Sequence, residues 1–219
     1  MRTLIFSDSH LNGFKEKKYN LMSSLISEAD QVIINGDFWE GYVHPFRNFL
    51  DSPWRNLFPL LKKKKTIYIY GNHDKKILSN DQVKLFSDKQ LQRLELKAGD
   101  KTYIFEHGNR FCSFGDEGMN PFDPKLKQST QITDVIQNFV VSYTNKAFIR
   151  LLLQRFNNTI KEKVAPELKE NEIYVCGHTH LAEFDEKNRF VNSGFINYGL
   201  AQYLILENNT LTPHEHRYE

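Results

Sequence analysis

Side chains that can bind metal ions or carry protons follow directly after several short apolar runs of this sequence. In chain order they are Asp8 and His10, then Asp37, then Asn72, His73 and Asp74, then His107, and finally His178 and His180. Each motif alone is typical of a turn, because Asp, Asn and His often end strands. Five of the eight histidines nevertheless fall in this set, and that clustering favours one shared site.

Two of these motifs place ligand-type residues two positions apart, Asp8 with His10 and His178 with His180. In an extended segment, residues at i and i+2 project to the same face. Ligand sites of open α/β sheets form outside the carboxyl ends of the strands. If the strands share such an arrangement, the side chains that follow them converge on one place.

The ligand set is larger than a single four-coordinate structural zinc requires. Imidazole and carboxylate ligands without thiolate suit two borderline divalent ions, such as manganese, iron, nickel, cobalt or zinc, better than calcium or magnesium. A pair of such ions promotes in-line displacement at phosphorus. One carboxylate must bridge the pair, which favours a short Asp at a rigid strand end.

The apolar runs themselves predict strands buried on both faces. They lie at residues 3–10, 31–37, 66–74, 101–109 and 172–180. Helical patterns at 14–29 and 46–61 separate the first three runs, so we expect an α/β domain with parallel central strands. "ELKAGDKTYIF" predicts a hairpin. The residues after Gly194 predict terminal strands joined by an Asn-Asn turn.

The segment from about 110 to 170 is interpreted as a helical insert. After the loop "SFGDEGMNPFDP", apolar residues recur at helical spacing from Ile132 to Phe156, which predicts two amphipathic helices. The insert could form a lid whose apolar wall comes from Phe139, Phe148 or Phe156. It could equally pack on the domain. Arg110 could contact a phosphate or lie on the surface.

Composition sets the remaining expectations. The 219 residues carry a formal charge of +2, so no global field points to nucleic acid or to an anionic membrane. The two cysteines, Cys112 and Cys176, form no CxxC motif and fit a reducing compartment. The short apolar run in "MRTLIFSDSH" leads us to expect neither a signal peptide nor a membrane span there, and the sequence shows no apolar run of 18 residues. We therefore expect one domain over residues 1–219 in a cytoplasmic protein.

The ordered motifs "DSH", "NGD", "GNHD", "HG" and "GHTH" resemble the signature of the calcineurin-like metallophosphoesterases and span residues 8 to 180. The resemblance implies a four-layer αββα sandwich of two mixed sheets flanked by helices. It also implies two divalent ions, manganese first, with iron, nickel, cobalt or zinc as alternatives. The implied ligands are Asp8, His10 and His180 for the first ion, Asn72, His107 and His178 for the second, and Asp37 as the bridge.

The chemistry implied by this resemblance is hydrolysis of a phosphomonoester, phosphodiester or pyrophosphate bond. Two cations would neutralise phosphate oxygens and supply a metal-bound hydroxide near neutral pH. His73 would lie beside the leaving group and donate a proton to it. The carboxylate of Asp74 would orient His73 and favour its protonated form.

The expected substrate is a small phosphoester or a nucleotide-type molecule. An alternative is similarity to the UDP-2,3-diacylglucosamine diphosphatases of lipid A synthesis, supported by "GDFWEGY" and the helical insert. Peripheral membrane contact would accompany such a lipid substrate. "GNHD" and "HGN" depart from the "GNRD" and "HGD" usual in those enzymes. A further alternative is a catalytically silent scaffold of the same fold. The aromatic faces of the insert would also permit a homodimer.

Overall fold

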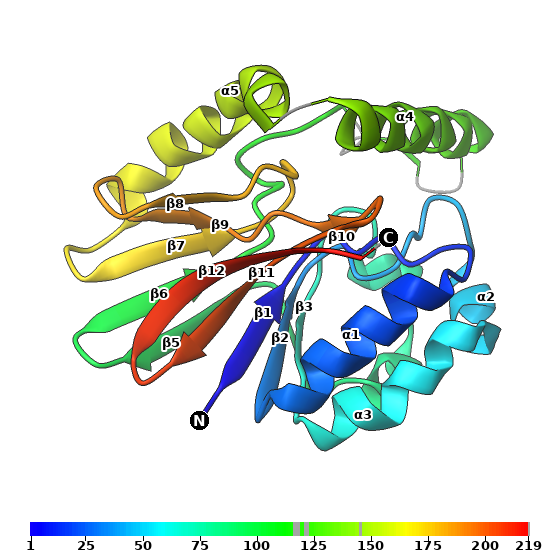
Figure 1. Cartoon of the computed structure of the whole chain (residues 1–219), viewed down its shortest axis with the longest axis horizontal. Helices are drawn as coiled ribbons and strands as arrows, with labels where there is room; N and C mark the ends of the chain where they lie inside the picture. The colour runs from blue at the N-terminus through cyan, green and yellow to red at the C-terminus, as the bar shows by residue number, and fades with distance from the viewer. Residues whose placement is uncertain (116–118, 121–122, 145, 219) are drawn as a thin grey trace.

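Two β-sheets form the centre of the computed structural model, which describes residues 1–115, 119–120, 123–144 and 146–218 (Figure 1). In this part of the chain the first sheet has seven strands in the order β10-β11-β1-β2-β3-β4, with β12 beside β11. Its strands are β1 (Thr3–Phe6), β2 (Gln31–Asn35), β3 (Ile67–Ile69), β4 (Lys89–Leu91), β10 (Ile196–Asn197), β11 (Leu200–Glu207) and β12 (Thr210–Arg217).

The second sheet has five strands in these described ranges, in the order β5-β6-β7-β9-β8. They are β5 (Leu94–Ala98), β6 (Lys101–Phe105), β7 (Glu172–Cys176), β8 (Glu183–Asp185) and β9 (Phe190–Asn192). Both sheets are mixed: β1 to β4 run parallel, as do β6, β7 and β9. Antiparallel pairing joins β11 to β1, β10 and β12 in the first sheet, and joins β5 to β6 and β8 to β9 in the second.

An apolar layer between the sheets explains why the central strands read as continuous hydrophobic runs. Ile5 and Ile33 of the first sheet share a buried cluster with Phe105 and Val175 of the second. The opposite face of the first sheet buries Leu4 and Val32 against the helices. Strands covered on both faces need apolar residues at every position, as the sequence pattern predicts.

Helices cover the outer faces and complete the predicted four-layer sandwich (Figure 1). On the first sheet lie α1 (Glu16–Glu28), α2 (Phe46–Asp51), the 3₁₀ helix η1 (Pro53–Leu57) and α3 (Phe58–Lys63). The helical pattern predicted at 46–61 corresponds to three consecutive short helices rather than to one continuous helix. It is interrupted at Ser52, which has extended dihedral angles before Pro53, because proline disfavours a helical conformation in the preceding residue.

The predicted hairpin is β5–β6, and the Asn-Asn turn is Asn208–Asn209, which joins β11 and β12. Both asparagines have positive φ, as this tight turn requires. Sequence reasoning missed β4, β8 and β9. Each is only three residues long, too short for a period-2 pattern to register.

The two predicted insert helices are α4 (Pro124–Tyr143) and α5 (Lys146–Val164), and the loop before them lies partly outside the described residues. They lie above the edge where the central strands end (Figure 1). Phe156 packs with Ile160 against the second sheet, whereas Phe139 is 61% exposed. Short 3₁₀ helices complete the fold at η2 (Lys76–Leu78), η3 (Asp81–Leu85) and η4 (Ala165–Glu167). Across the described residues, every helix is too short or too polar to span a bilayer.

Candidate metal centre

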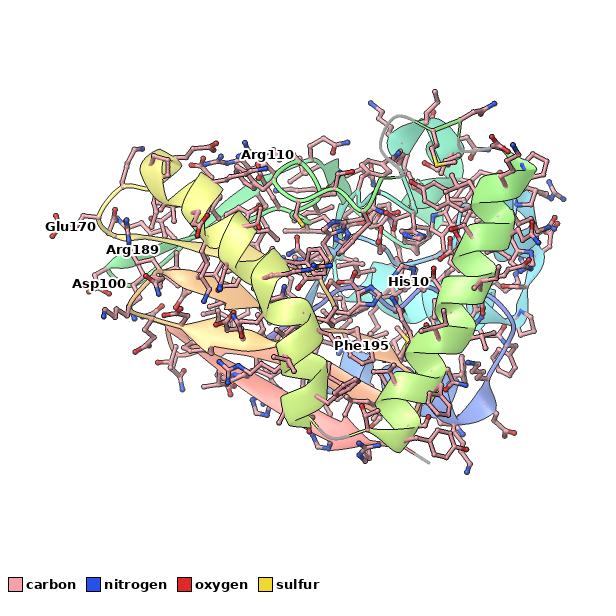
Figure 2. The ribbon with its side chains drawn as sticks, turned by 90° about the horizontal axis from the view of Figure 1, so that it is seen from above. His10, Asp100, Arg110, Glu170, Arg189 and Phe195 are labelled. Carbon is pink, nitrogen blue, oxygen red and sulfur yellow. The ribbon has the colours of Figure 1, made fainter. Side chains whose placement is uncertain are left out.

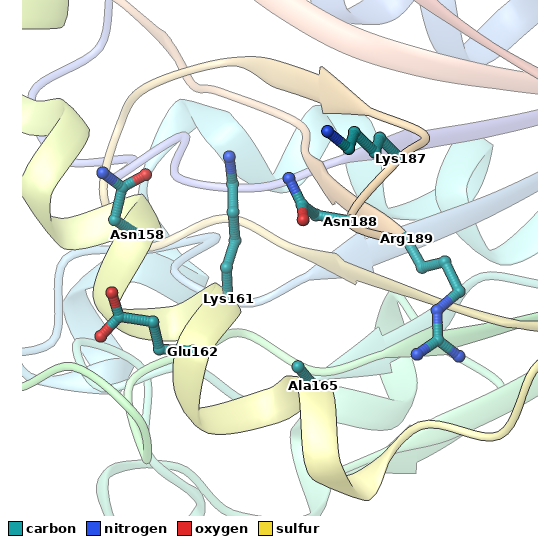
Figure 3. A pocket seen from close by; sticks show the side chains of 7 residues that line it. All are labelled: Asn158, Lys161, Glu162, Ala165, Lys187, Asn188 and Arg189. Carbon is teal, nitrogen blue, oxygen red and sulfur yellow. The ribbon is translucent and has the colours of Figure 1, made fainter.

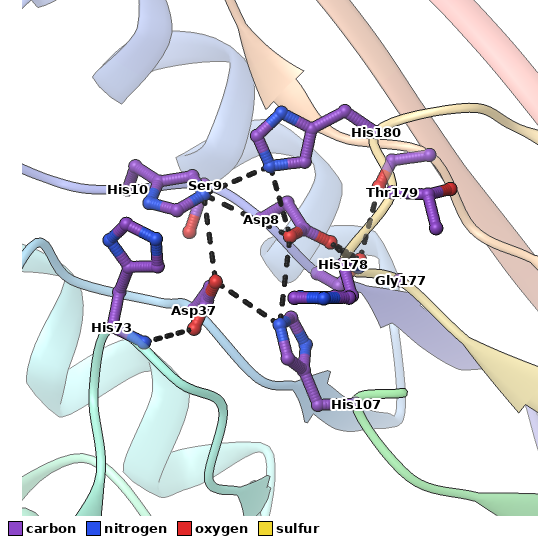
Figure 4. A network of polar contacts seen from close by, with 12 residues as sticks. Asp8, Ser9, His10, Asp37, His73, His107, Gly177, His178, Thr179 and His180 are labelled. Atoms are coloured by element: carbon purple, nitrogen blue, oxygen red, sulfur yellow. Dashed lines mark hydrogen bonds and ion pairs between the residues drawn. The ribbon is translucent and has the colours of Figure 1, made fainter. Parts of the chain in front are cut away.

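The loops that follow five strands meet at one edge of the sandwich and bring the chemistry-bearing side chains together (Figure 4). Backbone hydrogen bonds hold neighbouring loops side by side: the amide of Asp8 donates to Gly36 O (3.1 Å) and that of Gly177 to His107 O (3.0 Å). Asn35 joins the two sheets, since its side-chain amide donates to Glu106 O and Val175 O.

Candidate ligand atoms fall into two neighbouring groups, each within 4.8 Å. The first is Asp8, His10 and His180, and the second is Asp37, His107 and His178. Asn72 lies in the second group, because its Oδ1 is 3.0 Å from His178 Nδ1 and 3.1 Å from His107 Nε2. A third combination joins His10, Asp37 and His73. All seven predicted ligands thus lie in one site.

Asp8 shows that these side chains suit a cation. Its Oδ1 is buried and has no hydrogen-bond partner among the described residues. Three histidine Nε2 atoms surround it, at 3.2 Å for His180, 3.8 Å for His10 and 3.9 Å for His107. A buried carboxylate oxygen without a partner is costly. Divalent ions shared with these imidazoles would satisfy it, so the donor set fits the metals that the family implies.

Five of the candidate ligands have left-handed backbone conformations: Asp8, His10, Asp37, His178 and His180 have φ between 39° and 67°. Residues with side chains adopt this region at a cost, and such strain concentrates at functional sites. The i, i+2 pairs therefore share a site for a different reason from the one predicted. They follow strands that end at Phe6 and Cys176 and turn sharply rather than continuing as extended segments.

Three positions beside the ligands must be glycine, because side chains from other loops lie directly against their backbone. A Cβ at Gly36 would collide with the ring of His107, one at Gly71 with Asp37 Oδ1, and one at Gly177 with Asp8 Oδ2. Gly36 also has φ +90°, which side chains rarely adopt. The glycines of "NGD", "GNHD" and "GHTH" thus let ligand side chains from other strands pass directly over the backbone.

Glu40 is the important site residue that sequence reasoning left undecided. Its buried carboxylate contacts two imidazoles: Oε2 is 2.9 Å from His10 Nδ1, and Oε1 is 2.8 Å from His73 Nδ1. Burial alone would raise the pKa of Glu40, but the neighbouring His73 and His10 outweigh it and lower the pKa to about 2. Its position three residues after Asp37 in "DFWE" was the signal available in the sequence.

Asp74 has a different role from the one implied by the resemblance. Its carboxylate accepts hydrogen bonds from the backbone amides of Gly71 (2.6 Å), Phe38 (2.7 Å) and Asp37 (3.1 Å). Burial, together with the charge of Asp37, raises the pKa of Asp74 to about 6. The expectation that Asp74 orients His73 is therefore wrong, because Glu40 holds that ring. Asp74 instead fixes the loop that carries Asp37.

The carboxylates of the site act differently on the pKa values of two neighbouring histidines. Burial lowers the pKa of His107, but the charges of Asp37 and Asp8 outweigh burial and raise it to about 10. Burial and the adjacent His107 lower the pKa of His178 to about 4. A neutral imidazole is the form that binds metal. The two histidines titrate in opposite directions because only His107 lies directly against the carboxylates.

Two buried polar residues on helices support the ligand loops and were missed from the sequence. The ammonium of Lys18 in α1 donates to Ser9 O, between Asp8 and His10, and to Asn197 Oδ1 (3.2 Å). Asn157 of α5 accepts from Thr179 Oγ1 (2.6 Å) and donates to Leu181 O (3.1 Å), holding the loop of His178 and His180. Sequence alone shows only polar residues on amphipathic helices, which usually face solvent.

Arg110 takes no part in the site. Its guanidinium pairs with Glu106 (2.8 Å) and Glu167 (2.7 Å) and stacks on the ring of Phe111. Figure 2, viewed from above, places Arg110 far from His10. Of the two readings open from the sequence, a surface residue is the one observed.

The sequence and the fold of this chain are similar to those of known proteins. The family model described as "Calcineurin-like phosphoesterase superfamily domain" matches residues 1–207. The fold is similar to that of Yfce, a phosphoesterase from E. coli (TM-score 0.51, 16% identity, all of both chains covered). It is also similar to an archaeal phosphodiesterase (TM-score 0.50, 17% identity, 99% of each chain covered). A search of curated proteins finds no match.

Proposed function

The chain belongs to the calcineurin-like phosphoesterase superfamily, and from that premise we propose that it hydrolyses a phosphoester at a centre of two divalent metal ions. Family membership makes it a metal-dependent phosphoric ester hydrolase. The observation that carries the two-ion proposal is the convergence of seven candidate ligand side chains in one buried site, where three histidine Nε2 atoms face the buried Asp8 Oδ1. One four-coordinate ion would leave several of these buried groups unsatisfied.

We assign Asp8, His10 and His180 to the first ion and Asn72, His107 and His178 to the second. Asp37 is assigned as the bridge, because its Oδ2 lies 3.7 Å from His10 Nε2 and 3.1 Å from His107 Nε2. Asp8 Oδ1 also reaches both groups, but it lies 3.9 Å from His107 Nε2, so Asp37 is the carboxylate that lies closer to the second group. Manganese is the proposed ion, with iron, nickel, cobalt and zinc as alternatives that the same donors accept.

Bound ions of this kind polarise phosphoryl oxygens and lower the pKa of water. The chain itself supplies proton transfer through His73. Glu40 holds Nδ1 of that ring, so Nε2 is the atom that we assign to proton donation to the leaving oxygen. The contact with Glu40 fixes the orientation of the imidazole for this step. The edge of the His10 ring lies against His73, with ring centres 4.6 Å apart, which keeps the proton donor beside the first ligand group.

The test of this proposal is metal content together with metal-dependent turnover. Purified protein should bind two divalent ions per chain and hydrolyse bis-p-nitrophenyl phosphate in the presence of Mn²⁺. Treatment with EDTA should abolish hydrolysis, and added Mn²⁺ should restore it. A chain that neither retains metal nor hydrolyses the ester with any divalent ion would instead be a scaffold of this fold.

Replacing Glu40 by Gln should lower kcat by about 10- to 100-fold, the usual effect of losing a residue that orients metal ligands. Gln preserves the shape but removes the charge that holds His10 and His73. Steady-state kinetics with a saturating Mn²⁺ series would measure the loss. Glu167→Gln is the matched control, because Glu167 pairs with Arg110 away from the site. Equal kcat values for Glu40→Gln and wild type would refute the positioning role.

A further inference from the structure

A cavity of about 490 Å³ connects the metal centre with the insert helices. This volume is typical of small-molecule sites. Figure 2 shows α4 and α5 on either side of the labelled His10 and Phe195. The cavity is lined at one end by site residues, including Asp37, Glu40, His73 and His180, and at the other by residues of the insert. A phosphate held at the metal centre would therefore extend the rest of its molecule between the two helices.

The wall away from the metal centre is mainly aliphatic. Helix α4 contributes Leu126, Ile136, Val140 and Val141, and α5 contributes Ile149, Leu152 and Leu153. Phe195, which precedes β10, packs with Val141 in a buried cluster that anchors α4 to the sheet. The apolar residues predicted for a lid wall were different. Phe139 and Phe148 do not line the cavity, because the helices are rotated so that other apolar residues face it.

The charge of the cavity lining bears on which substrate the cavity can hold. Lys15 and Lys75 lie behind the lining, over the rings of Tyr198 and Tyr42. Among the described residues that line the cavity there is no Lys or Arg, and the charged residue away from the metal centre is Asp134. Asp134 already accepts a hydrogen bond from Tyr198 (2.6 Å). A second phosphate or a nucleoside polyphosphate would need cationic partners here. The described lining residues offer no cationic side chain to such a group.

A second cavity is lined by cationic side chains, but it lies away from the metal centre. It measures about 420 Å³ and is lined by Lys161, Lys187 and Arg189 (Figure 3). Lys161 is already paired with Glu183 (2.6 Å) and Asp185 (2.7 Å). Arg189 donates to the backbone carbonyls of Leu168 and Lys169, which precede β7. Lys161 and Arg189 are thus engaged within the fold.

We infer that the substrate is a phosphoester whose remaining group is an uncharged hydrocarbon, held in the cavity between α4 and α5. The inference rests on the proposed function for the position of the phosphate. Aliphatic side chains favour a hydrocarbon by removing its surface from water. The polar side chains that α4 adds to the lining, Ser129, Thr130, Thr133, Asp134 and Gln137, are neutral or acidic. A charged phosphate in the tail of a nucleotide would therefore lose water without gaining a cationic partner from the described lining residues.

A chain-length series tests this inference directly. Alkyl p-nitrophenyl phosphates from methyl to octyl share one leaving group and differ only in the hydrocarbon. With Mn²⁺-loaded protein, kcat/KM should rise with chain length, by up to about fourfold for each methylene that the cavity buries. Thymidine 5′-(p-nitrophenyl phosphate) should be no better than the methyl ester. A flat series, or a preference for the thymidine ester, would overturn the inference and leave the phosphoesterase function standing.

Substitutions on α4 separate the cavity from the outer surface. Val140→Asp places a charge in the wall and should lower the octyl-to-methyl ratio of kcat/KM at least tenfold. Val140→Thr has nearly the same side-chain shape but adds a hydroxyl group, and it should also lower the octyl-to-methyl ratio. The inference can therefore still be tested if Val140→Asp fails to fold. Val135→Asp is the matched control, because Val135 is 69% exposed and lies outside the cavity. An unchanged ratio in both Val140 variants would contradict the assignment.

A binding measurement decides the inference even if no ester is hydrolysed. Calorimetry with Mn²⁺-treated full-length protein should show octylphosphonate binding at least tenfold more tightly than methylphosphonate. The difference should disappear in Val140→Asp but persist in Val135→Asp. Equal affinities for the two phosphonates would overturn the inference. Absence of turnover with preserved octyl preference would instead overturn the proposed function and retain the hydrocarbon site.

Discussion

Asp37→Asn is expected to reduce metal content from two ions per chain to one or fewer and to lower kcat/KM by on the order of 10³-fold or more. The reason is the position of Asp37 between the two ligand groups, where its Oδ2 lies 3.7 Å from His10 and 3.1 Å from His107. Losing the shared negative charge weakens the binding of both ions. Metal ions stabilise the charge of the transition state by several kcal/mol, and each 1.36 kcal/mol lost lowers the rate tenfold.

A second contact increases this effect. Asp37 Oδ1 accepts a hydrogen bond from the backbone amide of His73 (2.8 Å). Asn can preserve either that bond or a ligand oxygen toward the metals, but its NH₂ group cannot accept a hydrogen bond. Atomic spectroscopy on dialysed protein measures the ions, and steady-state kinetics measures the loss.

Asp51→Asn provides the control for the same chemical change. Asp51 pairs with Arg47 on the surface, where its side chain is 55% exposed. That variant should keep both ions and full activity. Retention of two ions with unchanged affinity in Asp37→Asn would show that another residue bridges the centre. Circular dichroism of the metal-free variants would separate a ligand effect from unfolding.

His73→Ala should lower kcat by about 10²- to 10⁴-fold, the range for loss of general acid–base catalysis, while metal content stays at two ions. The ring is held by Glu40 and packs against Tyr42, with ring centres 4.5 Å apart. The loss should be greater for an alkyl leaving group than for p-nitrophenolate. The alkoxide needs a proton to depart, whereas the nitrophenolate is stable without one.

The same experiment tests whether His73 is instead a metal ligand. Its ring nitrogen lies within 4.8 Å of ligand atoms of His10 and Asp37, so these three residues could also hold an ion. If His73 were a ligand, its removal would release an ion as Asp37→Asn does. His216→Ala is the matched control, since His216 stacks on Tyr203 in the outer strands. That variant should leave kcat and metal content unchanged.

Local sequence patterns were sufficient to predict the central strands, the hairpin, the Asn-Asn turn and the two insert helices. Buried parallel strands must be apolar along their length, and Asn-Asn supplies positive φ at a tight turn. Three short strands and the break at Ser52 were not predicted. A strand of three residues is too short to show an alternating pattern. The helical pattern on both sides of Ser52 hid the break that Pro53 causes by disfavouring a helical conformation in the residue before it.

We predicted that the ligands converge because each follows the end of a strand. The fold does bring them together, but the backbone conformation at Asp8, His10, His178 and His180 is left-handed and not extended. Sequence spacing suggested extended DxH and HxH pairs. The chain instead turns through left-handed conformations at both pairs, because loops from two sheets must aim their side chains at one point. Such strain is held in place by tertiary hydrogen bonds, which no local pattern records.

By itself, the sequence determined which residue types could bind metal and that they would follow buried strands, because both properties are local. Only the tertiary structure decided that Glu40 holds His73, that Asp74 fixes a loop, and that Arg110 faces away. It also decided which side of each insert helix faces the metal centre. These outcomes depend on contacts between residues distant in the chain, and those contacts exist only after the two sheets and the insert have packed together.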